Sequence, residues 1–307
     1  MNGPLPRVAL IAGPTASGKS ALALMVAERF GGTIINADSA QVYRDLRILT
    51  ARPSDEEEAR VPHRLFGHVD GAEPGYSAAR WAEEARGAIA ATLSEGRLPI
   101  LVGGTGMYLR TLLDGIAPVP EIDPTVRASV RAMPVYAAYA ALRREDPDAA
   151  ARLAPADSQR IARALEVVRS SGRPLAAWQA ERVGGIGDTI DLRATVLLPP
   201  REWLIARIDS RFADMADAGS EEVATLLARD DIPVDAPIRR AIGVPEVANW
   251  VRSVWSRDEA VAAGALATRR YAKRQYTWLR HQTPATWLRL TDIAGEERAS
   301  HLETLLR

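Results

Sequence analysis

An eight-residue glycine-rich segment constrains the fold of this chain more than any other feature. It reads Gly13-Pro14-Thr15-Ala16-Ser17-Gly18-Lys19-Ser20 and lies between an apolar run, residues 8–12, and a helix-forming run, residues 21–27. This order of strand, loop and helix carries the G-x-x-x-x-G-K-[ST] spacing of a P-loop. Backbone N–H groups in such a loop face an anion, the lysine approaches the outer phosphate, and the last hydroxyl coordinates Mg²⁺. The sequence therefore predicts that residues 13–20 bind a di- or triphosphate group, with Mg²⁺ at Ser20.

Three further apolar runs predict buried strands at residues 32–38, 98–102 and 192–198. Together with the P-loop they indicate an α/β fold, a P-loop NTPase-like core with a parallel sheet flanked by helices. After Gly115 the strand pattern stops, three prolines follow, and the composition is helical to about residue 183. We expect a core formed by residues 1–118 and 190–307, and a helical insertion domain at 119–189.

The bulk composition excludes several classes of protein. The chain has 307 residues, no cysteine and a formal net charge of zero, so disulfides and thiolate metal sites are excluded and no global field attracts nucleic acid. No apolar run approaches the length of a membrane span and no signal peptide is recognisable, so we expect a cytoplasmic protein without membrane contact.

Two polar residues follow predicted strands at the edge where ligands bind in open α/β sheets. Asp38 ends the second strand and has two open interpretations, a Mg²⁺ ligand of Walker-B type or a general base facing a substrate. Thr105 lies in Gly103-Gly104-Thr105-Gly106, a loop whose glycines permit close approach of backbone or substrate; a plain turn is the alternative. No Asn-Lys-x-Asp signal occurs, which argues against a GTPase.

Arginine-rich segments suggest contacts with phosphate. Arg239 and Arg240 lie beside Gly243 and predict an anion clamp. A predicted helix after Asp157 carries arginines off its apolar stripe, a surface that is usually solvated but also suits a phosphate backbone. We expect another basic helix near residue 275. Spacings of four, three and four residues place four of its side chains on one face: Arg269, Lys273, Tyr276 and Arg280. Basic residues interleaved with aromatic ones favour nucleic acid over a plain amphipathic helix.

Taken together, five stretches resemble one family, the tRNA dimethylallyltransferases of bacterial type. They fall in the family's order over nearly the whole chain: residues 13–20, Asp38-Ser39-Ala40-Gln41-Val42-Tyr43, residues 99–109, residues 157–167, and Thr268–Gln275 with Thr277-Trp278. The resemblance implies transfer of a dimethylallyl group from dimethylallyl diphosphate to N6 of the adenosine 3′-adjacent to the anticodon in tRNA. The P-loop then holds the donor's diphosphate, and Mg²⁺ is the expected cofactor.

The resemblance also implies roles for individual residues. The implied catalytic residues are Asp38 as the base, Thr105, Lys19 and Arg240. The implied contacts with the tRNA anticodon stem-loop are Asp38, Ser39, Ala40, Gln41, Thr105, Arg127, Gln159, Arg160, Ile161, Ala162 and Arg163, to which the basic helix adds Arg269, Lys273 and Arg280. We further expect a monomer.

The chain departs from the family's usual pattern at two places. Ile48-Leu49-Thr50-Ala51-Arg52-Pro53 replaces Ile-Gly-Thr-Ala-Lys-Pro, and Ile242-Gly243-Val244-Pro245-Glu246 replaces Ile-Gly-Tyr-Lys-Glu. Pro245 has no backbone N–H to donate, so the family's pattern does not predict the contacts made by the residues after Arg240. Two competing functions fit a P-loop: a small-molecule or nucleoside kinase, and a non-catalytic RNA-binding ATPase. Both predict ATP binding in preference to dimethylallyl diphosphate.

Overall fold

The computed structural model describes residues 3–291 and divides the chain into two compact units, one formed by residues 1–112 and 187–307 and the other by residues 113–186. These boundaries differ by a few residues from the expected 119–189. The last part of the expected core, residues 292–307, lies outside the described residues.

The larger unit is built on a six-stranded sheet in which every pair of neighbours is parallel, in the order β3-β2-β4-β1-β5-β6. The strands are β1 (Arg7–Ala12), β2 (Gly32–Ala37), β3 (His63–Arg64), β4 (Leu98–Gly103), β5 (Asp191–Leu197) and β6 (Leu288–Leu290). The predicted parallel α/β core is thus confirmed. The two edge strands escaped the sequence analysis because they are two and three residues long, too short for a periodic pattern.

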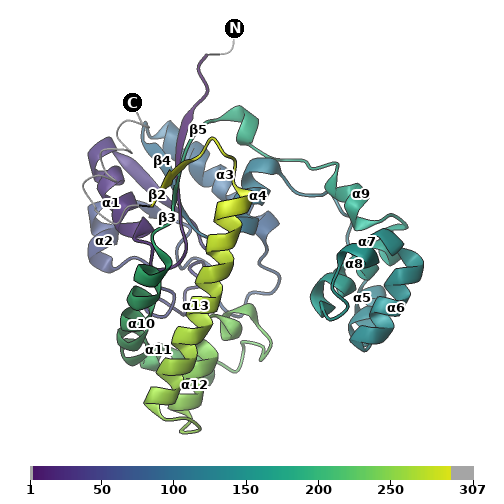
Figure 1. Ribbon diagram of the computed structural model, residues 1–307. Helices are drawn as coiled ribbons and strands as arrows, with labels where there is room; N and C mark the ends of the chain where they lie inside the picture. Colours follow the sequence, from purple (N-terminus) through teal and green to yellow (C-terminus); the bar gives the residue numbers. More distant parts are fainter. Residues whose placement is uncertain (1–2, 292–307) are drawn as a thin grey trace. The chain divides into compact units, whose positions relative to one another are not determined.

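Helices surround this sheet as Figure 1 shows. In the first half they are α1 (Lys19–Phe30), α2 (Asp55–Arg60), α3 (Ala78–Ser94) and α4 (Gly106–Asp114). In the second half they are the short 3₁₀ turns η1 (Gly187–Thr189) and η2 (Pro237–Arg240) and the α-helices α10 (Arg201–Ala218), α11 (Ser220–Ala228), α12 (Val244–Val251) and α13 (Arg257–Gln282). In Figure 1 helices α10 to α12 lie beyond the carboxyl ends of the strands.

Both faces of the sheet are buried, as its run of apolar residues requires. Ile34, Ile100 and Val102 pack with the apolar side of α1. Their neighbours Ile35 and Leu101 point to the opposite face and are completely buried there, where α3 contacts β2 and β4. The sheet therefore holds the loops at its carboxyl edge on a rigid base.

The smaller unit is a bundle of short helices, drawn in teal in Figure 1. It contains α5 (Pro124–Arg131), α6 (Val135–Glu145), α7 (Pro147–Arg152), α8 (Ser158–Ser171) and α9 (Leu175–Gln179). Ile161 and Leu165 of α8 are fully buried with Leu142 of α6 in its core, and an isolated bridge between Ile116 and Val183 joins the ends of the segment. This unit has an apolar core of its own.

Candidate active site

The P-loop forms an anion-binding turn between β1 and α1. Gly18 adopts φ 87° immediately before α1, and no side chain caps the first turn of that helix, so its backbone N–H groups are available to a ligand. Ala16 also has a positive φ of 63°, a conformation that is uncommon for a residue with a side chain. The loop is closed by a hydrogen bond from Ser17 N–H to the Pro14 carbonyl oxygen at 3.2 Å.

Lys19 is buried beneath this loop, with its Nζ 3.4 Å from the Pro14 carbonyl oxygen. Burial lowers the pKa of Lys19 below its usual value; the Asp38 carboxylate opposes that shift, and the Arg211 guanidinium adds to it. An ammonium group desolvated in this way gains more from a bound anion than an exposed lysine does.

A cavity of about 450 Å³ opens beside the P-loop in the larger unit. Its polar lining includes Thr15, Asp38, Ser39, Thr105, Arg211, Arg240 and Tyr271. Its apolar lining includes Leu49, Met107, Ile208, Phe212, Met215 and Ile242. Four of the lining residues, Ile208, Arg211, Phe212 and Met215, lie on one face of α10. The cavity therefore joins an anion-binding end to an apolar wall.

Asp38 follows β2 directly and is 8% exposed. Its Oδ1 accepts a hydrogen bond from Ala40 N–H at 3.0 Å, and its backbone is held by the Asn36 side chain through two further bonds. Within residues 3–291 no group donates to Oδ2, which leaves that oxygen for a ligand in the cavity. The carboxylate is thus oriented at one oxygen and available at the other, the arrangement that a general base needs.

Thr105 lies opposite Asp38 because β2 and β4 are parallel neighbours, paired at Ala37 and Gly103. Its Oγ1 accepts a hydrogen bond from Ser39 N–H at 3.0 Å. A Cβ on Gly103 would overlap the Ala37 backbone, and one on Gly104 would lie 2.5 Å from the Gly13 carbonyl oxygen. Glycine is therefore required at both positions by the close approach of the Ala37 and Gly13 backbones.

Gln275 of α13 links the two glycine-rich loops. Its Oε1 accepts from Thr15 N–H at 2.8 Å, and its Nε2 donates to the Gly104 carbonyl oxygen at 3.1 Å. The side chain is buried, at 4% exposure. The sequence analysis assigned no role to Gln275, since nothing in a linear pattern shows that residues 15, 104 and 275 meet.

Two arginines line the cavity without a carboxylate partner among the described residues. Arg211 was missed by the sequence analysis; it is accessible from the cavity, yet the surrounding protein lowers the pKa of its guanidinium, chiefly through desolvation. Arg240 donates only to the Asp235 carbonyl oxygen at 2.6 Å. Arg239 instead bonds the carbonyl oxygens of Arg229 and Ile232, so the predicted clamp divides into one cavity residue and one structural residue.

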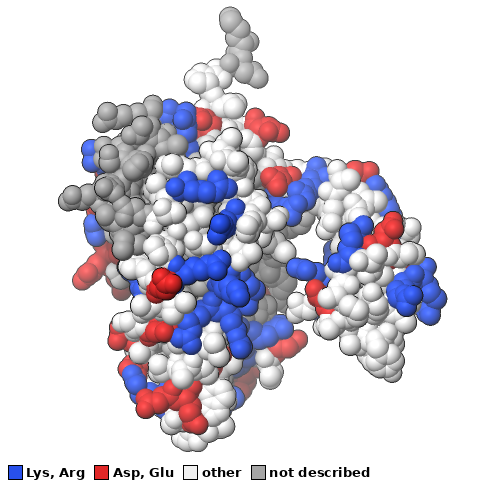
Figure 2. Space-filling view, in the orientation of Figure 1, with Lys and Arg blue, Asp and Glu red and all other residues white. Residues whose placement is uncertain are grey.

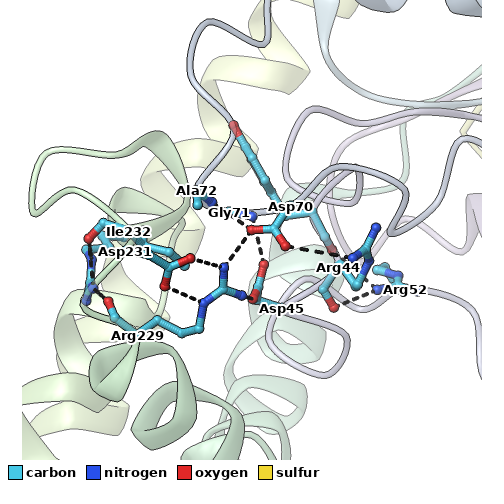
Figure 3. A network of polar contacts seen from close by, with 11 residues as sticks. Arg44, Asp45, Arg52, Asp70, Gly71, Ala72, Arg229, Asp231 and Ile232 are labelled. Carbon is cyan, nitrogen blue, oxygen red and sulfur yellow. Dashed lines mark hydrogen bonds and ion pairs between the residues drawn. The ribbon is translucent and has the colours of Figure 1, made fainter.

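A charged network, shown in Figure 3, joins the segment after β2 to the residues that follow α11. Arg229 donates to Asp45 and to Asp70 at 2.8 Å each, and to Asp231 at 2.6 Å. Nearby, the Glu222 carboxylate accepts three backbone N–H groups, from Arg47, Ile48 and Leu49. These bonds hold residues 45–70 against α11 and the turn that carries Arg240.

Several expected site residues do not line this cavity, and of residues 13–20 only Thr15 and Ala16 do. Ser20 is exposed and lines a separate small pocket with Gln41 and Glu57. Gln41 uses its Nε2 for the carbonyl oxygens of Thr50 and Ala51, so only its Oε1 remains for a ligand. In the part of the chain that the structure describes, no cluster of three or more His, Asp or Glu side chains is arranged to hold a metal ion.

The predicted basic helix is α13, and Figure 2 shows Lys and Arg side chains gathered over the face that it crosses. Arg269 forms an ion pair with Asp209 at 2.6 Å, and Tyr276 is partly buried under Arg201. The exposed cations of the helix that have no carboxylate partner among residues 3–291 are Arg270, Lys273, Arg274 and Arg280. Arg270 and Arg274 were not among the expected residues.

All but one of the residues expected to contact tRNA in the smaller unit are exposed or half-buried. Arg127, Gln159, Arg160 and Arg163 are exposed and Ala162 is half-buried. The Ile161 side chain is buried in the bundle core, so a contact through that side chain is excluded. Arg131 and Arg163 flank the buried Glu166 carboxylate at 3.0 and 3.9 Å. Burial lowers the pKa of Arg163, Glu166 opposes that shift, and the Arg127 guanidinium adds to it. This cluster carries more positive than negative charge.

We expect Gln275→Leu to weaken the binding of inorganic diphosphate, because the variant leaves Thr15 N–H and the Gly104 carbonyl oxygen unsatisfied. Each unsatisfied buried group costs about 1–3 kcal/mol, so the dissociation constant measured by titration calorimetry should rise at least tenfold, and the midpoint of thermal unfolding should fall. Gln282→Leu, an exposed residue of the same helix, is the control. Unchanged binding and stability in Gln275→Leu contradict the bridging role.

Comparisons with known proteins identify the family. The profile described as IPP transferase matches residues 41–282. A tRNA dimethylallyltransferase of Sphingopyxis alaskensis is 62% identical over 98% of both chains, and that of Zymomonas mobilis is 53% identical over 93% of this chain and 91% of its own. The crystal structure of a tRNA isopentenylpyrophosphate transferase from Bacillus halodurans matches with a TM-score of 0.70 and 32% identity, covering 98% of this chain and 95% of that one.

A eukaryotic dimethylallyltransferase acting on tRNA matches with a TM-score of 0.80 and 28% identity, over 97% of this chain and 77% of its own. None of the helices among residues 3–291 is long and apolar enough to cross a membrane. The extent and identity of these matches, added to the P-loop and the paired strand ends, show that the chain belongs to the IPP transferase family.

Proposed function

We propose that this chain transfers a dimethylallyl group from dimethylallyl diphosphate to N6 of the adenosine 3′-adjacent to the anticodon in tRNA. The observation that carries the proposal is the cavity, which places an anion-binding turn, a carboxylate with one available oxygen and an apolar wall around one space. Membership of the IPP transferase family argues against the kinase and the RNA-binding ATPase.

The diphosphate is held by residues 13–20 and by the unpaired cations. Thr15 and Ala16 of the P-loop line the cavity with Arg211 and Arg240, and the Lys19 ammonium lies close enough to Asp38 and Arg211 for their charges to act on its pKa. As the C1–O bond of the donor breaks, the electron pair stays on the leaving diphosphate. Preorganised donors in a low-dielectric site stabilise that developing charge.

Asp38 acts as the general base. Adenine N6 attacks C1 of the dimethylallyl group, the new N–C bond forms as the C1–O bond breaks, and the proton of the amine passes to Asp38 Oδ2. Ala40 N–H keeps the carboxylate in orientation through Oδ1. Thr105 and Ser39, which are linked by hydrogen bonds, contact the adenosine from the side of β4.

The Ser20 hydroxyl lines a small pocket separate from the cavity, so Mg²⁺ would take at most this one protein ligand here and be held largely by the substrate. Ser20 offers one hydroxyl at the start of α1, and Mg²⁺ in proteins takes most of its ligands from water and phosphate oxygens. When bound, the ion neutralises charge on the leaving diphosphate. We propose that Ser20 and the P-loop amides orient the diphosphate for it.

Two surfaces suit the tRNA. The exposed cations of α13 and the cluster of Arg127, Arg160 and Arg163 on the smaller unit match a phosphate backbone. The target base has to leave the stack of the anticodon loop before it reaches Asp38. We further propose that the enzyme acts in the cytoplasm as a monomer.

Asp38→Asn should lower the turnover number by about 10²–10⁴-fold while leaving the KM for dimethylallyl diphosphate nearly unchanged, because asparagine keeps the bond from Ala40 and cannot take a proton. The measurement is mass spectrometry of nucleosides from an anticodon stem-loop incubated with protein, Mg²⁺ and dimethylallyl diphosphate. Asp258→Asn, at an exposed carboxylate of α13, is the control. Full turnover in Asp38→Asn rules out the base assignment.

Arg211→Gln should raise the KM for dimethylallyl diphosphate by at least tenfold, since a charge-assisted hydrogen bond contributes about 1.5–3 kcal/mol. The KM for the RNA should stay the same, which steady-state kinetics with each substrate varied in turn can test. Arg207→Gln is the matched control one turn away, where the guanidinium lies over Trp203 at 5.1 Å. Equal effects from the two variants would remove Arg211 from the diphosphate site.

Lys273→Ala should weaken tRNA binding and reduce the slope of log K against log salt by about 1, the value for one lost phosphate contact. Arg269→Ala should change the slope less, because Asp209 already neutralises that guanidinium. Fluorescence anisotropy with a labelled stem-loop at several salt concentrations measures both slopes. If Arg269→Ala has the larger effect, the exposed cations are not the RNA contacts.

A further inference from the structure

Phe212 lines the apolar side of the cavity, and its ring is only 4% exposed. The ring lies between backbones on two sides. A Cβ on Gly264 of α13 would overlap it, and one on Gly243 would lie 3.1 Å from its Cε2. Gly243 has φ 94°, where a residue with a side chain is strained. The two glycines therefore make room for the ring and also prevent it from moving back.

Leu49 lines the same side of the cavity, because it and Phe212 both lie within 3.5 Å of the Cβ position of Gly243. It is buried, and its side chain lies within 3.5 Å of the Cβ positions of both Gly219 and Gly243. The backbone before it is held by the Glu222 carboxylate. The wall formed by Leu49 and Phe212 is thus fixed on both sides, unlike the side of the cavity at Met107, which is 70% exposed.

Phe212 also lies next to the anion site along α10. Arg211, its neighbour in sequence, lines the cavity without a carboxylate partner among the described residues. A prenyl diphosphate whose phosphates meet Arg211 and the P-loop has its hydrocarbon part directed along the apolar residues of this helix. We propose, on the basis of the proposed function, that Phe212 limits the prenyl donor to one isoprene unit by blocking the space that a second unit needs.

The size of the ring supports this role. A phenyl ring and an isoprene unit are similar in bulk, so removing the ring opens about the space that the longer chain of geranyl diphosphate requires. Interiors are close-packed and do not give way to an extra isoprene unit without a cost. The native protein should therefore discriminate against geranyl diphosphate by its wall, whereas both donors present the same diphosphate to residues 13–20.

The test compares dimethylallyl and geranyl diphosphate as donors for the native protein and for Phe212→Ala, with the modified nucleoside identified by mass. The native protein should form only the dimethylallyl product. Phe212→Ala should form the geranyl product, with the ratio of kcat/KM for geranyl to dimethylallyl diphosphate raised at least tenfold, because even one methylene in an apolar pocket changes such ratios by about 10–200-fold. Inhibition of dimethylallyl transfer by geranyl diphosphate should strengthen in parallel.

Two further variants separate this role from general loosening. Phe212→Val opens less space than Phe212→Ala. It replaces Phe212→Ala in the test if circular dichroism shows that Phe212→Ala does not fold. Met107→Ala enlarges the exposed side of the cavity and should leave the ratio unchanged. A folded Phe212 variant that transfers dimethylallyl but keeps the native ratio overturns the proposal, as does a native protein that accepts geranyl diphosphate equally well. Failure of the native protein to transfer either donor instead refutes the proposed function.

Discussion

Two hydrogen bonds from Gln275 hold the catalytic end of this protein together. The P-loop after β1 and the glycine-rich loop after β4 each present a backbone group to this one buried amide. A buried donor or acceptor without a partner is costly, so α13 and the sheet edge can pack closely only in the register that satisfies both bonds. That register also brings Tyr271 into the cavity and leaves Lys273 on the surface. One helix thus supplies both the support of the two glycine-rich loops and the exposed cations that we propose as an RNA surface.

The charged side chains around the cavity are mostly positive. Arg211 and Arg240 line the cavity with Asp38, and Lys19 lies close enough to Asp38 and Arg211 for their charges to act on its pKa. Partly desolvated cations raise the free energy of the empty protein and are stabilised when an anion arrives. The same desolvation that lowers the pKa of Lys19 therefore favours a substrate that carries its negative charge at one end and hydrocarbon at the other.

Loops are the mobile parts of many enzymes. In this structure, two sets of contacts hold the segment after β2 in place. Arg229 joins three aspartates, and Glu222 collects three backbone N–H groups at residues 47–49. These contacts fix Leu49 in the apolar wall of the cavity, whereas Asp38 is held by the Asn36 side chain and by Ala40 N–H. The placement of this part of the apolar wall therefore depends on α11, which contributes none of the residues that line the cavity.

The sequence by itself determined the P-loop, the parallel sheet and the position of Asp38 and Thr105 at the ends of neighbouring strands. Each of these rests on local spacing or on the alternation of a strand, which are properties of short stretches of chain. Only the tertiary structure decided that Gln275 bridges Thr15 and Gly104, that Asp209 pairs with Arg269, that Ile161 is core and that Arg211 lies in the cavity with Phe212 beside it. Those facts depend on contacts between residues far apart in the chain, and a single sequence carries no signal of which distant partner a side chain will meet.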